Sequence, residues 1–170
     1  MGTISDVQFI NIIASGEQGI VMTGSKESIL KDISFENVQL TISRGQFTDI
    51  NGGNFDLRPT NDAKTNLFKH DIPAVYAAKI EGLTIKDLKI SWDASLPGYF
   101  TNALWCDHFN HLTIEGLTAS AGPQAAASEA IVSLHDGSDA HITGLKTDAK
   151  GPAKHPLILQ KNVIAPENHK

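Results

Sequence analysis

Leu83-Thr84-Ile85-Lys86-Asp87-Leu88 decides the fold, because its pattern occurs five times in the 170 residues of the chain. Apolar residues occupy the first, third and sixth positions of each copy, and the fifth is Asn, Asp or Gly. Alternation with a period of two indicates a strand, and these fifth residues accept a left-handed backbone, so each strand is expected to bend there. The other copies are 7–12, 33–38, 112–117 and 140–145.

The distances between copies are typical of a solenoid. Successive copies start 26, 50, 29 and 28 residues apart. A second family of apolar segments recurs at 55, 29, 27 and 26 residues. Both series lengthen at the same place, so the extra residues lie between Ile42 and Pro73. The segments of the second family are 19–22, 74–77, 103–106, 130–133 and 156–159.

These repeats predict an all-β, right-handed parallel β-helix of about six coils with one long loop. We expect a single domain over 1–170, in which 1–42 form the first coils and 43–73 a long loop or irregular coil. Residues 74–164 form regular coils and 165–170 a tail. Coils bury their apolar faces only against neighbours, so the ends need caps. The first copy begins at Val7, and little sequence precedes it to cover that end.

Composition excludes several classes of partner. The net charge is −5 and the basic residues are scattered, which argues against nucleic acid and anionic membranes. The single cysteine, Cys106, excludes an internal disulfide, and no apolar run is long enough to cross a membrane. Residues 1–4 do not resemble a secretion signal, so the compartment is left open. We predict no cofactor.

A family resemblance rests on several segments in order. They are Asp56-Leu57-Arg58-Pro59, His70-x-Ile72-Pro73-x-Val75-Tyr76-Ala77, the strand 83–87 followed by Trp92, and Tyr99-Phe100-x-Asn102-Ala103-Leu104. Together with the repeated hexad, they resemble the C-terminal part of right-handed parallel β-helix proteins of the pectin-lyase-like superfamily. The resemblance is to family 28 glycoside hydrolases, the polygalacturonase and rhamnogalacturonase group, and covers roughly residues 4–164.

The resemblance implies hydrolysis of pectic or similar acidic polysaccharide by two carboxyl groups that invert the anomeric centre. The family's Asn-Thr-Asp, Asp-Asp, Gly-His-Gly and Arg-Ile-Lys segments do not occur here, so no catalytic residue is carried over. Those segments would lie on coils before Ile4. We therefore expect the chain to be the C-terminal third of a larger molecule, inactive alone, from a family found outside the cell or in the periplasm.

The candidate substrate-binding residues are Asp56, Arg58, His70, Tyr76 and Trp105. Asp56 and Arg58 are two positions apart and face the same way in an extended chain. Arg58 could clamp a uronate carboxylate while Asp56 holds the guanidinium. The alternative is a local ion pair that fixes the loop to the coils.

The second strand family predicts an aromatic stripe. Its central column is predicted to contain Val21, Tyr76, Trp105, Val132 and Ile158. Apolar residues also flank this column, so both faces of these strands are apolar. The stripe could stack against sugar rings, or the 43–73 loop or the tail could cover it.

The remaining polar residues favour structural roles. Cys106, Asp107, His108 and His111 offer a metal-like set, with Cys106 and His108 predicted on one side, but no second ligand pair follows and a solvated strand end is favoured. His135, Asp136 and His141 are expected at turns and on the surface. Asn11, Asn37 and Asp87 are expected to bond from coil to coil at the bends.

Three functions therefore stay open. The chain could be part of a glycoside hydrolase, a non-catalytic glycan-binding or structural solenoid such as an adhesin segment, or part of a polysaccharide lyase. In each case the expected partner is a polysaccharide or oligosaccharide.

Overall fold

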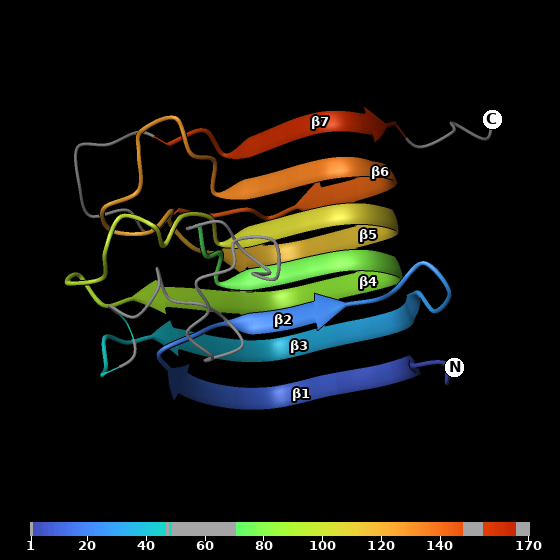
Figure 1. Ribbon diagram of the computed structural model, residues 1–170, viewed down its shortest axis with the longest axis horizontal. Coiled ribbons are helices and arrows are strands. Elements are labelled where there is room, and N and C mark those ends of the chain that lie inside the picture. The colour runs from blue at the N-terminus through green and yellow to red at the C-terminus, as the bar shows by residue number, and fades with distance from the viewer. Residues whose placement is uncertain (1, 47, 49–70, 148–154, 166–170) are drawn as a thin grey trace.

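The computed structural model describes residues 2–46, 48, 71–147 and 155–165. Within these ranges the chain forms strands and no helix, so there is no helix that could span a membrane. The strands stack one above another along the molecule (Figure 1). They are β1 (Ser5–Gly16), β2 (Ile20–Thr23), β3 (Leu30–Ile42), β4 (Val75–Trp92), β5 (Leu104–Thr118), β6 (Val132–Thr143) and β7 (Ile158–Ile164).

All described strand pairs are parallel, in the order β1-β3-β4-β5-β6-β7, and β2 pairs with β4. β2 and β3 lie on successive parts of β4 and together make one coil. The prediction of a parallel β-solenoid is confirmed, with about four turns instead of six. Six was too many because β1 supplies only the second part of a coil and β7 only the first, so the terminal repeats fill incomplete turns.

Left-handed residues let a single long strand wrap around the core. β4 has positive φ at Lys79, Gly82 and Asp87, and each of these positions recurs in other coils. The predicted bend at the fifth position of the hexad is confirmed in all five copies. The first column of bends contains Lys79, His108, Asp136 and Asn162; the second, Asp6, Asp32, Gly82, His111 and Asp139; the third, Asn11, Asn37, Asp87, Gly116 and Gly144.

The third column also confirms a predicted contact between coils. The side-chain amide of Asn37 donates to Oδ1 of Asn11 at 2.7 Å. Further along the column, the carboxylate of Asp87 lies over Gly116, where an added Cβ would stand 2.7 Å from Asp87 Oδ1. Where Asn or Asp is present, its side chain therefore supplies a hydrogen-bonding group at the bend. Where Gly is present, it leaves room for the carboxylate of the neighbouring coil.

The hexads pair in the predicted register, so that Val7, Ile33, Leu83, Leu112 and Ala140 form one column. The prediction for the other strand family was wrong by one residue at its end. Trp105 pairs with Ser133, which in turn pairs with Leu159. Val132 pairs with the inward Leu104, and Ile158 pairs with Val132. The bends set this register, because His108 must align with Asp136 and Asn162.

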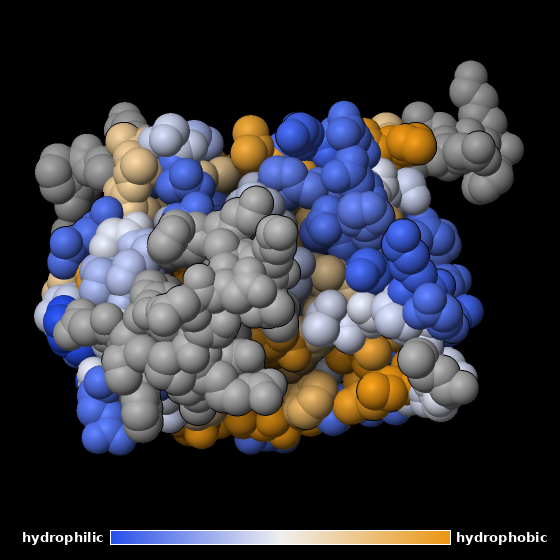
Figure 2. Space-filling view, in the orientation of Figure 1, coloured by the Kyte–Doolittle hydropathy of each residue, from blue (hydrophilic) through white to orange (hydrophobic). Residues whose placement is uncertain are grey.

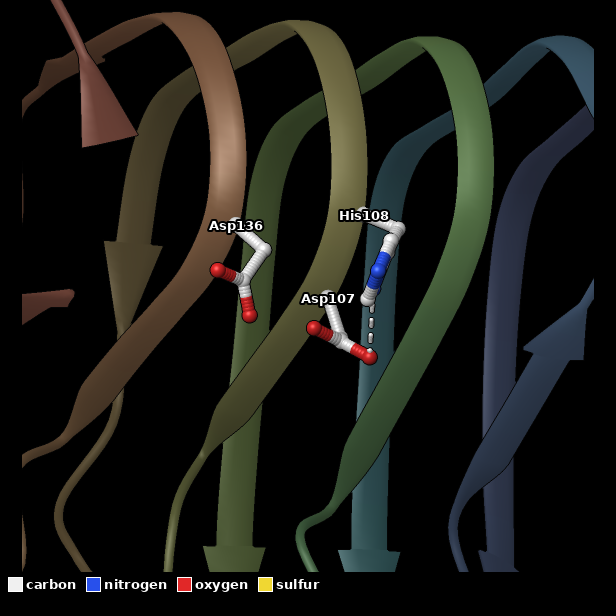
Figure 3. Close-up of side chains that lie close together, drawn as sticks. All are labelled: Asp107, His108 and Asp136. Atoms are coloured by element: carbon white, nitrogen blue, oxygen red, sulfur yellow. Dashed lines mark ion pairs between the residues drawn. The ribbon is translucent and has the colours of Figure 1, made fainter. Parts of the chain in front are cut away.

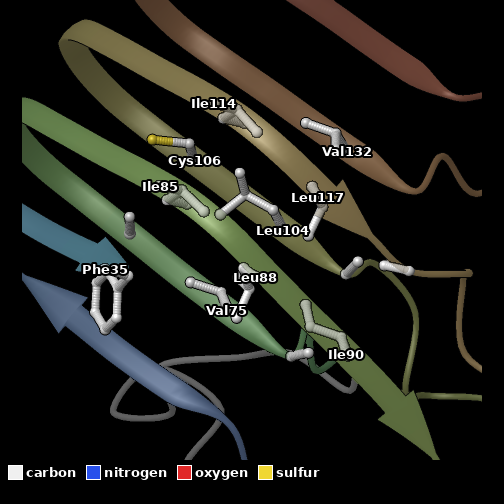
Figure 4. Close-up of a cluster of buried hydrophobic side chains, with 14 of the residues drawn as sticks. Phe35, Val75, Ile85, Leu88, Ile90, Leu104, Cys106, Ile114, Leu117 and Val132 are labelled. Carbon is white, nitrogen blue, oxygen red and sulfur yellow. The ribbon is translucent and has the colours of Figure 1, made fainter. Parts of the chain in front are cut away.

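Stacked aliphatic side chains fill the interior (Figure 4). Ile85, Leu88 and Leu117 are at most 1% exposed, and each comes from a column that continues through neighbouring coils. Burying one such side chain contributes about 1.5–3 kcal/mol. In one column a large residue lies next to a glycine on the neighbouring coil. An added Cβ on Gly137 would lie 2.3 Å from Cε1 of Phe109, so the lack of a side chain at Gly137 makes room for that ring.

The two ends differ from the interior. Every exposed large hydrophobic residue in the described part of the chain lies before Thr23 or after Pro156. Figure 2 shows apolar residues gathered along the edge where β1 and β2 lie. Within the described residues, apolar side chains therefore stay exposed at both ends of the stack of coils. The residues are Ile4, Phe9, Ile10, Ile13, Val21, Leu157, Ile158, Leu159 and Ile164.

Candidate functional site

Three of the five candidate substrate-binding residues, Asp56, Arg58 and His70, lie outside the described residues, and their roles stay predictions. Tyr76 and Trp105 are neighbours in register on β4 and β5. Both are half-buried and point away from the core, between the inward positions Val75 and Ala77 on β4 and the corresponding positions on β5. The structure thus brings these two aromatic residues together.

Trp105 stacks on a histidine that sequence reasoning placed in a turn. The rings of Trp105 and His135 lie 4.2 Å apart with an interplanar angle of 10°. Nε2 of His135 is 2.8 Å from Oγ of Ser133, the residue that pairs with Trp105. Because His135 occupies one face of the indole, that face is closed to a stacking sugar.

Burial and nearby charges shift the pKa values of this surface. Burial, followed by the nearby Asp107 and Cys106, raises the pKa of Tyr76 above 10.0. Burial lowers the pKa of His135 below 6.5, although the neighbouring Asp107 opposes the shift. Tyr76 and His135 are therefore neutral at pH 7, and both can exchange hydrogen bonds with hydroxyl groups.

Asp107, His108 and Asp136 lie at the first bend, next to this surface (Figure 3). Their potential ligand atoms are all within 4.8 Å of one another, and Nδ1 of His108 is 3.0 Å from Oδ2 of Asp107. Asn162 donates to Oδ1 of Asp136 at 2.8 Å. Imidazole and carboxylate groups can hold a divalent cation, but these groups also satisfy one another as hydrogen-bonding partners. The prediction that the chain holds no metal stays a prediction.

Cys106 takes no part in this cluster. Its side chain points into the core and is fully buried, and burial raises the pKa of its thiol to about 12. The prediction that Cys106 and His108 share one side was wrong, because the left-handed bend at His108 interrupts the strand alternation. His111 lies at the second bend and pairs instead with Asp139.

A polar groove runs along the outer surface beside the second bend. Its cavity volume is about 300 Å³. The groove is lined by Asp6 and Gln8 of β1, Asp32, Ile33 and Ser34 of β3, Gly82 and Thr84 of β4, and His111 and Thr113 of β5. Four coils therefore contribute to one surface.

The groove is a direct consequence of strand alternation. Gln8, Ser34, Thr84 and Thr113 occupy the second position of the hexad, between two inward-facing positions, and pair in one column. Gly82 has no side chain, and an added Cβ there would stand 2.5 Å from Oδ1 of Asp32. Neighbouring strands are about 4.8 Å apart, so the column repeats a hydroxyl or amide group at that interval.

Sequence reasoning missed this groove, although the hexads contain its signal. The second position of the hexad is polar in all five copies. The acidic bend residues Asp6 and Asp32 lie just before the first two hexads. Their side chains could be assigned to the same surface only after the bends were placed.

These features define the class of the protein: a parallel β-solenoid with a polar groove on its side and an aromatic and acidic corner next to it. Comparison of the chain with protein-family models, with curated proteins and with solved structures found no match.

Proposed function

We propose that this protein is a polysaccharide-binding β-solenoid and that the polar groove is where the glycan lies. The carrying observation is the column of Gln8, Ser34, Thr84 and Thr113, which repeats one uncharged hydrogen-bonding side chain per coil. A periodic row of hydroxyl and amide groups suits a linear ligand with periodic hydroxyls. Each hydrogen bond contributes about 0.5–1.5 kcal/mol.

The proposal extends to the family resemblance described above. The sequence resembles family 28 glycoside hydrolases without their catalytic carboxylate segments, so we propose binding of a pectic or related glycan and no hydrolysis by this chain. The second candidate is a non-catalytic glycan-binding or structural solenoid that is not part of a hydrolase, such as an adhesin segment, and the groove serves it equally well. A lyase needs a base next to a cationic group that neutralises the uronate, and Arg58, the residue considered for that role, lies outside the described residues.

The charge of the groove makes the proposal more specific. Asp6 and Asp32 line it, and no Lys or Arg is among its described lining residues. A uronate would meet like charges there, so we expect neutral pectic side chains such as galactan or arabinan to bind better at neutral pH. A divalent cation that bridges carboxylates would reverse that preference.

The test is isothermal titration calorimetry with polygalacturonate, rhamnogalacturonan, galactan and arabinan oligosaccharides. Replacing both threonines of the groove, Thr84→Val and Thr113→Val, removes two hydroxyl groups with little change in shape. We expect affinity to fall about tenfold or more, since two hydrogen bonds are lost.

Thr118→Val is the matched control, because Thr118 is also half-buried on β5 but is not among the groove residues. An unchanged affinity in the Thr84/Thr113 variant, or no binding of any oligosaccharide, would contradict the proposal. Release of reducing ends by the protein would contradict the absence of hydrolysis.

A further inference from the structure

His111 of β5 is the groove residue that can gain a positive charge near neutral pH. The described lining residues include the carboxylates of Asp6 and Asp32 but no lysine or arginine, and His111 is the one histidine among them. Its side chain is 60% exposed, so a ligand can reach the ring. Imidazole is the side-chain type that takes up a proton between about pH 8 and pH 5. His111 therefore decides whether this part of the groove contains a cation.

Asp139 of β6 fixes the orientation of the His111 ring. The two residues occupy the same column at the second bend, with φ of 55° at each. Nδ1 of His111 is hydrogen-bonded to Oδ2 of Asp139. An ionised carboxylate only accepts hydrogen bonds, so Nδ1 of the neutral ring carries the proton and donates. The lone pair of Nε2 is then left for a group on the ligand.

Asp32 of β3 approaches His111 from the other side of β4. The order β3-β4-β5 places Gly82 between them in the column of the second bend. The carboxylate of Asp32 lies over Gly82, since an added Cβ there would stand 2.5 Å from Oδ1. Asp32 and His111 both line the groove, and in the described part of the chain they form no ion pair with each other. A ligand over Gly82 would therefore meet a carboxylate and an imidazole.

We propose that His111 is the specificity-determining residue of the groove. When neutral, it accepts a hydrogen bond from a sugar hydroxyl at Nε2, and when protonated, it donates one to a uronate carboxylate. The inference rests on the proposed glycan binding and assigns its choice of sugar to one side chain. At neutral pH Asp32 and His111 are both acceptors, which suits the hydroxyl groups of a neutral glycan. At acidic pH the charged ring supplies the cationic donor that a uronate requires.

The other charged groups near His111 lie on both neighbouring strands. On β6 they are Asp139, its hydrogen-bonding partner, and His141, which is exposed and is not among the described groove residues. On β4 the nearest is Glu81, which forms an ion pair with Lys31 at 3.1 Å. These groups are the same in a variant that changes His111 alone, so such a variant isolates the effect of this ring.

Calorimetry with oligogalacturonate and with a galactan oligosaccharide, at about pH 8 and about pH 5, tests the inference. In the unchanged protein, the affinity for oligogalacturonate relative to galactan should rise about tenfold or more at the lower pH, because a charge-assisted hydrogen bond is gained. Carboxylic acids stay largely ionised at about pH 5, so the ligand keeps its charge. His111→Asn should abolish the rise. Asn fits this left-handed bend, as it does at Asn11 and Asn37.

His108→Asn is the matched control. His108 lies on the same strand and also has a left-handed backbone. Its Nδ1 is 3.0 Å from Oδ2 of Asp107, but it is not among the described groove residues. This variant should keep the full rise in relative affinity. Circular dichroism of both variants checks that they fold.

Nuclear magnetic resonance of the imidazole nitrogens tests the ring without a ligand. In the free protein at about pH 8, His111 should be in the tautomer with the proton on Nδ1. Asp139→Gly removes the carboxylate with a residue that accepts the bend, and it should lower the population of that tautomer. A neutral His111 ring with its proton on Nε2 would overturn the inference.

The binding results separate the inference from the proposed function. An equal rise in the unchanged protein and in His111→Asn would overturn the inference, as would loss of the rise in His108→Asn. If galactan binding depends on Thr84 and Thr113 but the effect of pH does not depend on His111, the inference alone fails. If no oligosaccharide binds at either pH, the proposed function fails and the inference fails with it.

Discussion

The coils formed by β4 and β5 completely bury columns of side chains that β1 leaves partly exposed. Ile85 and Ile114 are 0% exposed, whereas Phe9, in the same column at the end, is 38% exposed. The residue type is apolar throughout, so the difference comes from the number of neighbouring coils. In this protein, as in other solenoids, a coil acquires its stability from the coils above and below it.

The outer face shows the opposite contrast, because there the residue types themselves change. In the middle, charges alternate along the columns, with Lys86 3.5 Å from Glu115 and Lys31 3.1 Å from Glu81. At the first coil, Ile10 and Ile13 replace such residues. Exposed ion pairs of this kind contribute about 0–1 kcal/mol, so they serve solubility more than stability. The first described coil therefore carries apolar residues at outer positions where the following coils carry polar or charged residues.

Leucine truncation gives the largest expected difference between the two regions. Leu117 and Leu145 occupy the same position of successive hexads, and Leu117 is 0% exposed whereas Leu145 is half-buried in the last one. Leu117→Ala should lower the free energy of unfolding by about 2–5 kcal/mol. Leu145→Ala should cost about half as much or less, since fewer contacts are lost. Chemical denaturation measures both, and equal losses would remove the distinction between middle and end.

Glycine replacement at a bend should have a smaller effect. Gly116 has φ +82°, and an added Cβ would approach Oδ1 of Asp87. Gly116→Ala should cost about 1–2 kcal/mol from the left-handed backbone alone. Gly116→Asn should recover part of that loss, because Asn37 and Asn11 hold the same conformation in this column. Thermal unfolding compares the two variants, and a more stable Ala variant would show that the column does not select Asn.

The smallest effect concerns the stacked pair of Trp105 and His135. The pKa of His135 is below 6.5, so the unfolded chain takes up this proton first as the pH falls. Its contribution to stability is fully present above pH 6.5 and decreases below it. Trp105 fluorescence should change over the same acidic range, when the ring becomes charged. His135→Phe keeps an aromatic neighbour without a titrating group. An identical pH dependence in that variant would assign the change to another residue.

Much of the fold could be predicted from the sequence, because the five hexads encode both the inward positions and the bends. The register of Leu83 with Leu112 and the left-handed backbone at Asn37 follow from the residue types of the hexads alone. The register of Val132 did not, since apolar residues on either side of it allow more than one alignment. Only the alignment of the bends at His108 and Asp136 resolves that ambiguity.

Less of the candidate site could be predicted. Tyr76 and Trp105 were predicted as neighbours and are neighbours, but the stacking of His135 on Trp105 depends on the corrected register. To predict the groove, two columns of residues would have to be combined, one on the strands and one at the bends. Side chains such as Asp32 and Thr113 are 81 residues apart in the sequence, and no local pattern connects them.

The sequence by itself determined that this chain forms a parallel β-solenoid, because the period of two and the left-handed residues are local properties of each hexad. Only the tertiary structure decided which polar residues share a groove and which apolar residues of the first coil stay exposed. Those properties depend on how coils stack, and stacking joins residues that are a full turn or more apart along the chain.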